Sequence, residues 1–155
     1  MDAEKEALIA ELDCARERLN LILDRVTPQV EIYPSWKLKQ VLDHVAGWDD
    51  AVIAAILSHS RGDVPAVTAP RGIDYYNAET VTTRESLPLE HSRREYDVTR
   101  EQLKQAIRDM PSDKFTQPFV SPWGRAGTMA WLVKIFVEHE LEHAREIEEI
   151  LNKVA

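Results

Sequence analysis

Residues 136–143 read Phe-Val-Glu-His-Glu-Leu-Glu-His, and the stretch around them lacks glycine and proline, which is typical of a helix. His139 and His143 are four residues apart, so they lie on the same helix face, with about 5–6 Å between their Cβ atoms. Two imidazoles at that separation can bind one metal ion at about 2.0–2.1 Å per nitrogen. Phe136 and Ile147 share this face. We therefore predict that both histidines point into a protein core.

A third histidine, His44, belongs to a second helical segment, residues 41–48 (Val-Leu-Asp-His-Val-Ala-Gly-Trp). Its neighbours on the helix face, Val41 and Trp48, are apolar, which predicts that His44 also points inward. If the two helix faces share one core, His44, His139 and His143 can bind one divalent ion. Zinc suits three imidazoles best, and nickel, iron or manganese are the alternatives. Three ligands leave one coordination position open, which is typical of a catalytic site.

Apolar residues recur at helical spacing in four long segments, approximately residues 8–26, 36–60, 88–110 and 128–152. Strand-like alternation is nearly absent. We predict an all-α fold, a four-helix bundle formed by a single domain over residues 1–155. The 28 residues from 61 to 88 are long enough for a crossover between the second and third helices, with a short helix over residues 73–81. Ser35 is the expected N-cap of the second helix.

Composition narrows the classes of partner. The net charge of −8 argues against nucleic acid or an anionic membrane surface as a partner. A single cysteine, Cys14, excludes an intrachain disulfide. No apolar stretch approaches the roughly 18 residues of a membrane span, and the N-terminus lacks a signal-peptide core. We expect a cytoplasmic protein with a small-molecule substrate, either monomeric or a homodimer. His59 and His91 flank connections and are expected at the surface.

The segment from His139 to His143 also matches the H-E-x-x-H pattern of zinc peptidases, in which the glutamate acts as general base. This makes Glu140 a candidate catalytic residue. A peptidase is disfavoured, because only twelve residues follow His143, none of them histidine, and no edge strand for a peptide substrate is evident. We instead expect Glu140 and Glu142 to lie on a solvated charged face, from which Glu140 could still touch a metal-bound water.

Three parts of the chain together resemble the DinB/YfiT-like superfamily: residues 36–49, with the pattern W…VLxHxxxW, residues 72–78, and the distant HxxxH of His139 and His143. The resemblance implies a four-helix bundle in which one histidine of the second helix and two of the fourth bind a divalent metal. It also implies a metal-dependent enzyme, since characterised relatives include transferases that use small thiols, such as mycothiol or bacillithiol, and maleylpyruvate isomerases.

The expected activity is therefore thiol S-transfer or hydrolysis on a small molecule, with a low-molecular-weight thiol as cosubstrate. The competing hypothesis is a non-catalytic or stress-related binding bundle with a structural metal. For an enzyme, the expected substrate pocket is lined by aromatic side chains, namely Trp48, Tyr75, Tyr76 and Trp123. The alternative for these aromatic residues is ordinary packing in the core or in the 115–127 segment, which we expect to fold over one end of the bundle.

Overall fold

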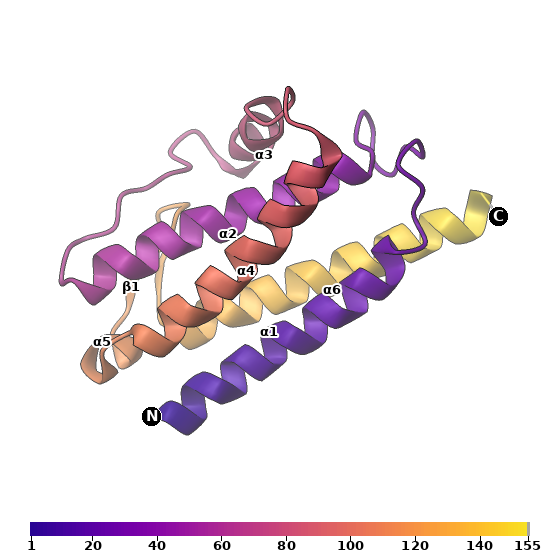
Figure 1. The fold of residues 1–155 in the computed structure, drawn as a ribbon. Helices are drawn as coiled ribbons and strands as arrows, with labels where there is room; N and C mark the ends of the chain where they lie inside the picture. The colour runs from indigo at the N-terminus through magenta and orange to yellow at the C-terminus, as the bar shows by residue number, and fades with distance from the viewer. Residues whose placement is uncertain (155) are drawn as a thin grey trace. The chain divides into compact units, whose positions relative to one another are not determined.

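The computed structural model describes residues 1–154, which are mostly helical (Figure 1). In chain order the elements are α1 (Asp2–Leu23), α2 (Leu38–Ser60), α3 (Ile73–Thr82), α4 (Leu89–Asp109), α5 (Ser112–Thr116), β1 (Phe119–Val120), β2 (Ala126–Gly127) and α6 (Met129–Val154). The chain forms two compact units, one of Met1–Leu38 with Ala130–Ala155 and one of Lys39–Met129. Within residues 1–154, no helix combines the length and the apolar character needed to cross a membrane.

In the first unit, α1 and α6 lie side by side and run in the same direction (Figure 1). Arg16 of α1 binds Glu140 of α6, and Arg25, just beyond the end of α1, binds Asn152 of α6. The predicted apolar stripe of α1 is buried, with Leu12 and Leu19 completely shielded from solvent. A narrow stripe of this kind is sufficient to pack two helices along their length.

In the second unit, α2 and α4 also run in the same direction (Figure 1). Asp49 of α2 and Arg100 of α4 form an ion pair at 3.0 Å, and both side chains are at most 3% exposed. The chain returns between the two helices through residues 61–88, and the short α3 lies within this connection. The predicted crossover and the predicted short helix are both confirmed.

Helix α3 packs on α2 at Gly47. The Tyr76 hydroxyl donates a hydrogen bond to the Gly47 carbonyl at 2.8 Å. A Cβ atom at position 47 would lie 2.7 Å from Cγ2 of Thr80. Glycine is therefore required here for the close approach of the two helices, although it costs about 1 kcal/mol in helix propensity relative to alanine.

The start of α2 differs from the prediction. The helix begins at Leu38 instead of Trp36, and Ser35 is not its N-cap. Residues 33–36 form a tight turn, in which the Trp36 amide donates to the Tyr33 carbonyl at 2.8 Å. Ser35 has a φ of 67°, and Pro34 precedes it. Proline followed by a residue with positive φ is typical of a type II turn, so turn formation replaces helix capping here.

Residues 115–127 cover the end of α2 within the second unit. Strands β1 and β2 pair antiparallel as a short hairpin after α5. Phe119 stacks on His59 at 4.6 Å between ring centroids, and Nε2 of His59 lies 2.8 Å from the Lys114 carbonyl oxygen. The expectation that His59 lies at the surface was wrong, because this segment folds back onto the end of α2 and leaves His59 only 6% exposed.

Candidate metal centre

His139 and His143 face each other on α6, as the i, i+4 spacing predicts. Their ring centroids are 4.3 Å apart, and their Nε2 atoms are separated by 2.9 Å. Two nitrogens bound tetrahedrally to one zinc ion at about 2.0–2.1 Å would be about 3.3 Å apart. The pair therefore needs to open by only a few tenths of an ångström to bind one ion. This donor geometry fits a divalent metal.

His44 belongs to the second unit, where α2 positions it one turn from Trp48. The side chain is 3% exposed, and Val41 and Trp48 on the same helix face are 0% and 6% exposed. The prediction that this face of α2 is buried is confirmed. A buried imidazole needs a hydrogen-bond or metal partner to offset the loss of hydration, which an apolar helix face does not itself supply.

Tyr33 contacts His143, although no motif in the sequence indicates this contact. Its hydroxyl oxygen lies 2.6 Å from Nδ1 of His143 and donates a hydrogen bond to Oε1 of Glu146 at 2.9 Å. Burial, together with this bond to Glu146, raises the pKa of Tyr33 above its usual value, so the phenol keeps its proton. Tyr33 lies in a turn outside any helical pattern, and no periodicity in the sequence indicates its position.

His143 is shielded from protonation. Burial lowers its pKa from 6.5 to about 4, the neighbouring His139 adds to the effect, and Glu140 opposes it. The side chain is 12% exposed. A neutral imidazole is the form that binds metal, so this environment keeps His143 ready as a ligand at neutral and mildly acidic pH.

The lowered pKa predicts acid sensitivity of the metal-free protein. As the pH falls from about 6.5 to 4, the unfolded chain binds a proton at residue 143 and the folded protein does not, so the free energy of unfolding falls in this window. We expect His143 to contribute about 3 kcal/mol to this fall. Urea denaturation in the presence of a chelator at pH 7, 5.5 and 4 measures it. A His143→Asn variant should lose this part of the pH dependence, whereas His91→Asn should keep it. An unchanged pH profile for His143→Asn would contradict the assignment.

Glu140 lies in a buried ion pair. It is 2% exposed, and its Oε1 accepts hydrogen bonds from Nε and Nη2 of Arg16 at 3.0 and 2.8 Å. The expectation of a solvated face is wrong for Glu140, because α1 packs on that side of α6, whereas Glu142 is exposed as expected. The contact with Arg16 favours a structural role for the carboxylate.

Three of the four predicted pocket residues form one aromatic cluster in the second unit. The Trp48 ring lies 4.5 Å from that of Tyr76 and 5.9 Å from that of Trp123. The indole N–H of Trp48 donates to Oδ1 of Asn77 at 2.6 Å, a contact that no motif in the sequence indicates. Tyr75, the fourth residue, is 44% exposed and instead stacks under the guanidinium of Arg71, at 4.1 Å from the ring centroid.

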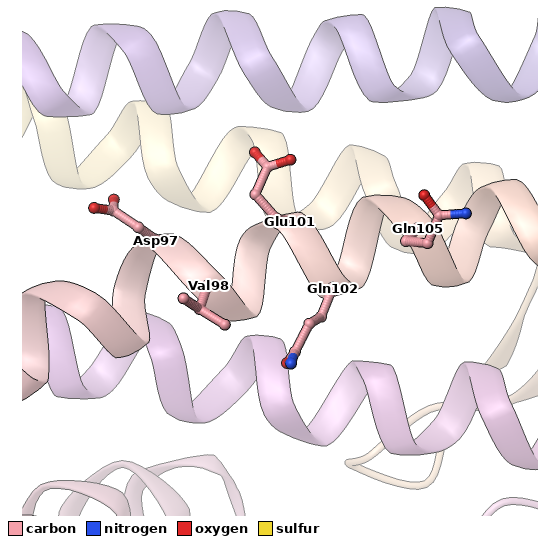
Figure 2. A pocket seen from close by; sticks show the side chains of 5 residues that line it. All are labelled: Asp97, Val98, Glu101, Gln102 and Gln105. Carbon is pink, nitrogen blue, oxygen red and sulfur yellow. The ribbon is translucent and has the colours of Figure 1, made fainter.

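A surface hollow runs along α4, well separated in sequence from the histidines and aromatic residues described above. Figure 2 shows the side chains that line it, all from this helix: Asp97, Val98, Glu101, Gln102 and Gln105. None of them is a candidate metal ligand or a member of the aromatic cluster. The hollow therefore gives no support to the predicted site.

The helix pairs and the two adjacent imidazoles of α6 define a helical-bundle protein with a histidine pair on one helix. The sequence profile of the DinB superfamily matches residues 29–147, and the chain belongs to this superfamily. The matched region includes parts of both units and all three histidines predicted as ligands. No curated protein matches the sequence.

Solved structures show the same fold at low sequence identity. A mycothiol-dependent maleylpyruvate isomerase matches with a TM-score of 0.77 and 14% identity, over 92% of this chain and 60% of the isomerase. The colibactin self-resistance protein ClbS, solved in complex with double-stranded DNA, matches with a TM-score of 0.74 and 15% identity, over 96% and 95% of the two chains. A Streptococcus pneumoniae protein matches with a TM-score of 0.73 and 13% identity, over 97% of this chain and 92% of that protein. The predicted all-α bundle is confirmed, and the chain spans less than two thirds of the isomerase.

Proposed function

We propose that His44, His139 and His143 bind one divalent metal ion, with zinc as the first choice and nickel, iron or manganese as alternatives. The observation that carries the proposal is the His139–His143 pair, whose Nε2 atoms are 2.9 Å apart. The buried position of His44 and the chemistry of the three imidazoles support it. The family match across both units supports one bundle domain over residues 1–155.

We further propose that the protein is a metal-dependent enzyme that acts on a small molecule, by transfer of a low-molecular-weight thiol or by hydrolysis. A divalent ion held by three imidazoles supplies a Lewis acid that polarises a carbonyl or lowers the pKa of a thiol or water. Support for a thiol comes from the mycothiol-dependent isomerase that shares the fold. We assign Glu140 a structural role and not a role in proton transfer, because its carboxylate forms an ion pair with Arg16.

The aromatic cluster supplies the proposed substrate contacts. Trp48, Tyr76 and Trp123 offer apolar ring surface, and the Asn77 amide beside the Trp48 indole offers polar groups that can orient a ligand. Tyr75 is left out because its ring stacks with Arg71.

The second candidate function is a binding bundle with a structural metal. In that case the metal has no position that a small ligand can reach. ClbS was solved with DNA, but the net charge of −8 on this chain opposes binding to a phosphate backbone, so we propose no nucleic-acid partner. We propose a cytoplasmic location and leave homodimer formation to measurement in solution.

Metal substitution distinguishes the two functions. The protein purified with zinc should contain about one ion per chain. After exchange for cobalt, the visible spectrum should change on addition of azide or a small thiol, because an open coordination position admits the ligand. A panel of electrophiles should then show metal-dependent consumption of the thiol. A cobalt spectrum that is insensitive to azide and thiols would exclude the enzyme and leave the structural metal.

A further inference from the structure

The hydroxyl group of Tyr33 lies between an imidazole and a carboxylate of α6. Its oxygen is 2.6 Å from Nδ1 of His143 and 2.9 Å from Oε1 of Glu146. The two rings meet edge to face, with centroids 5.6 Å apart and an interplanar angle of 73°. Both contacts lie within the first unit, so one packed body holds all three side chains.

Counting protons decides the direction of both hydrogen bonds. An ionised carboxylate only accepts, so the single phenolic proton of Tyr33 is donated to Glu146. The contact of 2.6 Å with His143 then requires a second proton, which must come from Nδ1–H of the imidazole. A neutral imidazole carries one proton on its two nitrogens. Nε2 of His143 therefore keeps its lone pair, and it is Nε2 that faces His139.

We infer that Tyr33 is a positioning residue that, together with Glu146, holds His143 in the tautomer with Nε2 available to bind a metal. This inference rests on the proposed metal site. Ligating histidines usually donate their other N–H to an oxygen, which fixes the orientation of the ring and strengthens the ligand. Here a phenol that is itself bound to a carboxylate supplies that oxygen.

The backbone around Tyr33 holds the hydroxyl in place before a metal binds. The tight turn over residues 33–36 is closed by the Trp36 amide, which donates to the Tyr33 carbonyl at 2.8 Å. The Trp36 ring contacts the Tyr33 ring edge to face, with centroids 6.1 Å apart. Ser35 adopts a φ of 67°, which completes the turn. A side chain fixed in this way loses little further entropy when His143 becomes a ligand.

Two substitutions test the inference on folded protein. Tyr33→Phe removes only the hydroxyl group and keeps the ring and the turn. Glu146→Leu keeps the hydroxyl but removes its acceptor, so the phenolic proton is free to turn to Nδ1 and reverse the tautomer. The matched control is Glu149→Leu on the same helix, since Glu149 is exposed and binds only Arg145 among the contacts of its side chain that the structure gives.

The first measurement is the tautomer of His143, read from long-range ¹H–¹⁵N correlation spectra of the metal-free protein at pH 7. The wild type and Glu149→Leu should carry the proton on Nδ1, whereas Glu146→Leu should shift it to Nε2. The second is zinc affinity by competition with a chelator, which should fall about 10–100-fold in Tyr33→Phe and in Glu146→Leu. Circular dichroism confirms that each variant is folded.

The outcomes separate this inference from the proposed function. Wild-type protein that binds zinc, with His143 protonated on Nε2 when metal-free, would overturn the positioning role and leave the metal site standing. Unchanged zinc affinity in both Tyr33→Phe and Glu146→Leu would do the same. Wild-type protein that binds no divalent metal would overturn the proposed function, and the positioning role with it.

Discussion

Alanine at His139 should reduce the zinc content of the purified protein from about one ion per chain to near zero. Two remaining imidazoles bind a divalent ion poorly, and the loss of a direct ligand should exceed the roughly 10–100-fold that the loss of an outer hydrogen bond costs. Elemental analysis after dialysis against a weak chelator measures the content. Full occupancy in the variant would exclude His139 as a ligand.

Two controls keep this result interpretable. His91→Ala removes a histidine of α4 that is outside the proposed ligand set and should retain the metal. Helix content measured by circular dichroism should be nearly the same in His139→Ala and the wild type. Chelation should lower the melting temperature of the wild type, because metal bound only by the folded state stabilises that state, and should have little effect on His139→Ala.

The helices could be predicted because their signal is local. Leu12 and Leu19 recur at helical spacing, and the structure buries both. The inward positions of Val41, His44 and Trp48 follow from the same periodicity. The crossover was predictable from the length of one connection and needed no knowledge of packing. Each of these inferences uses residues within a single segment.

The errors about burial concern contacts between segments that are distant in sequence, whereas the error at the start of α2 comes from the local turn over residues 33–36. Glu140 was expected in solvent, but its partner Arg16 is 124 residues away, and no helical spacing links the two. His59 is buried by Phe119, which follows it by 60 positions and stacks on its ring. Tyr33 reaches His143 from a turn whose geometry depends on the positive φ of Ser35. These contacts form only when the chain is folded, so no periodic pattern in the sequence predicts them.

The burial of Glu140 also bears on the H-E-x-x-H pattern. In a peptidase the glutamate of that pattern must reach a water beside the metal. Here Oε1 of Glu140 accepts two hydrogen bonds from the guanidinium of Arg16. This oxygen therefore links α6 to α1. The described residues contain only a two-stranded hairpin of two residues per strand, which offers little edge to a peptide substrate. The pattern thus arises from two metal-ligand candidates that flank a structural carboxylate.

Removing that carboxylate should be costly. Glu140→Ala should lower the free energy of unfolding by about 3–5 kcal/mol, because it leaves the Arg16 guanidinium buried without the carboxylate that it now binds. Urea denaturation of the metal-free protein at pH 7 measures the loss. The matched control is Glu149→Ala, which removes an exposed ion pair with Arg145 on the same helix and should cost at most about 0.5 kcal/mol.

A double substitution tests the physical reason. Arg16→Met combined with Glu140→Leu replaces both charges with apolar side chains of similar volume, so most of the stability lost in Glu140→Ala should return. If Glu140→Ala costs less than about 1 kcal/mol, the pair is hydrated in solution and the buried ion pair is not what joins α1 to α6. If the double variant is as unstable as Glu140→Ala, the cost comes from lost packing and not from an uncompensated charge. Metal content should be retained in the double variant, since neither residue belongs to the proposed ligand set.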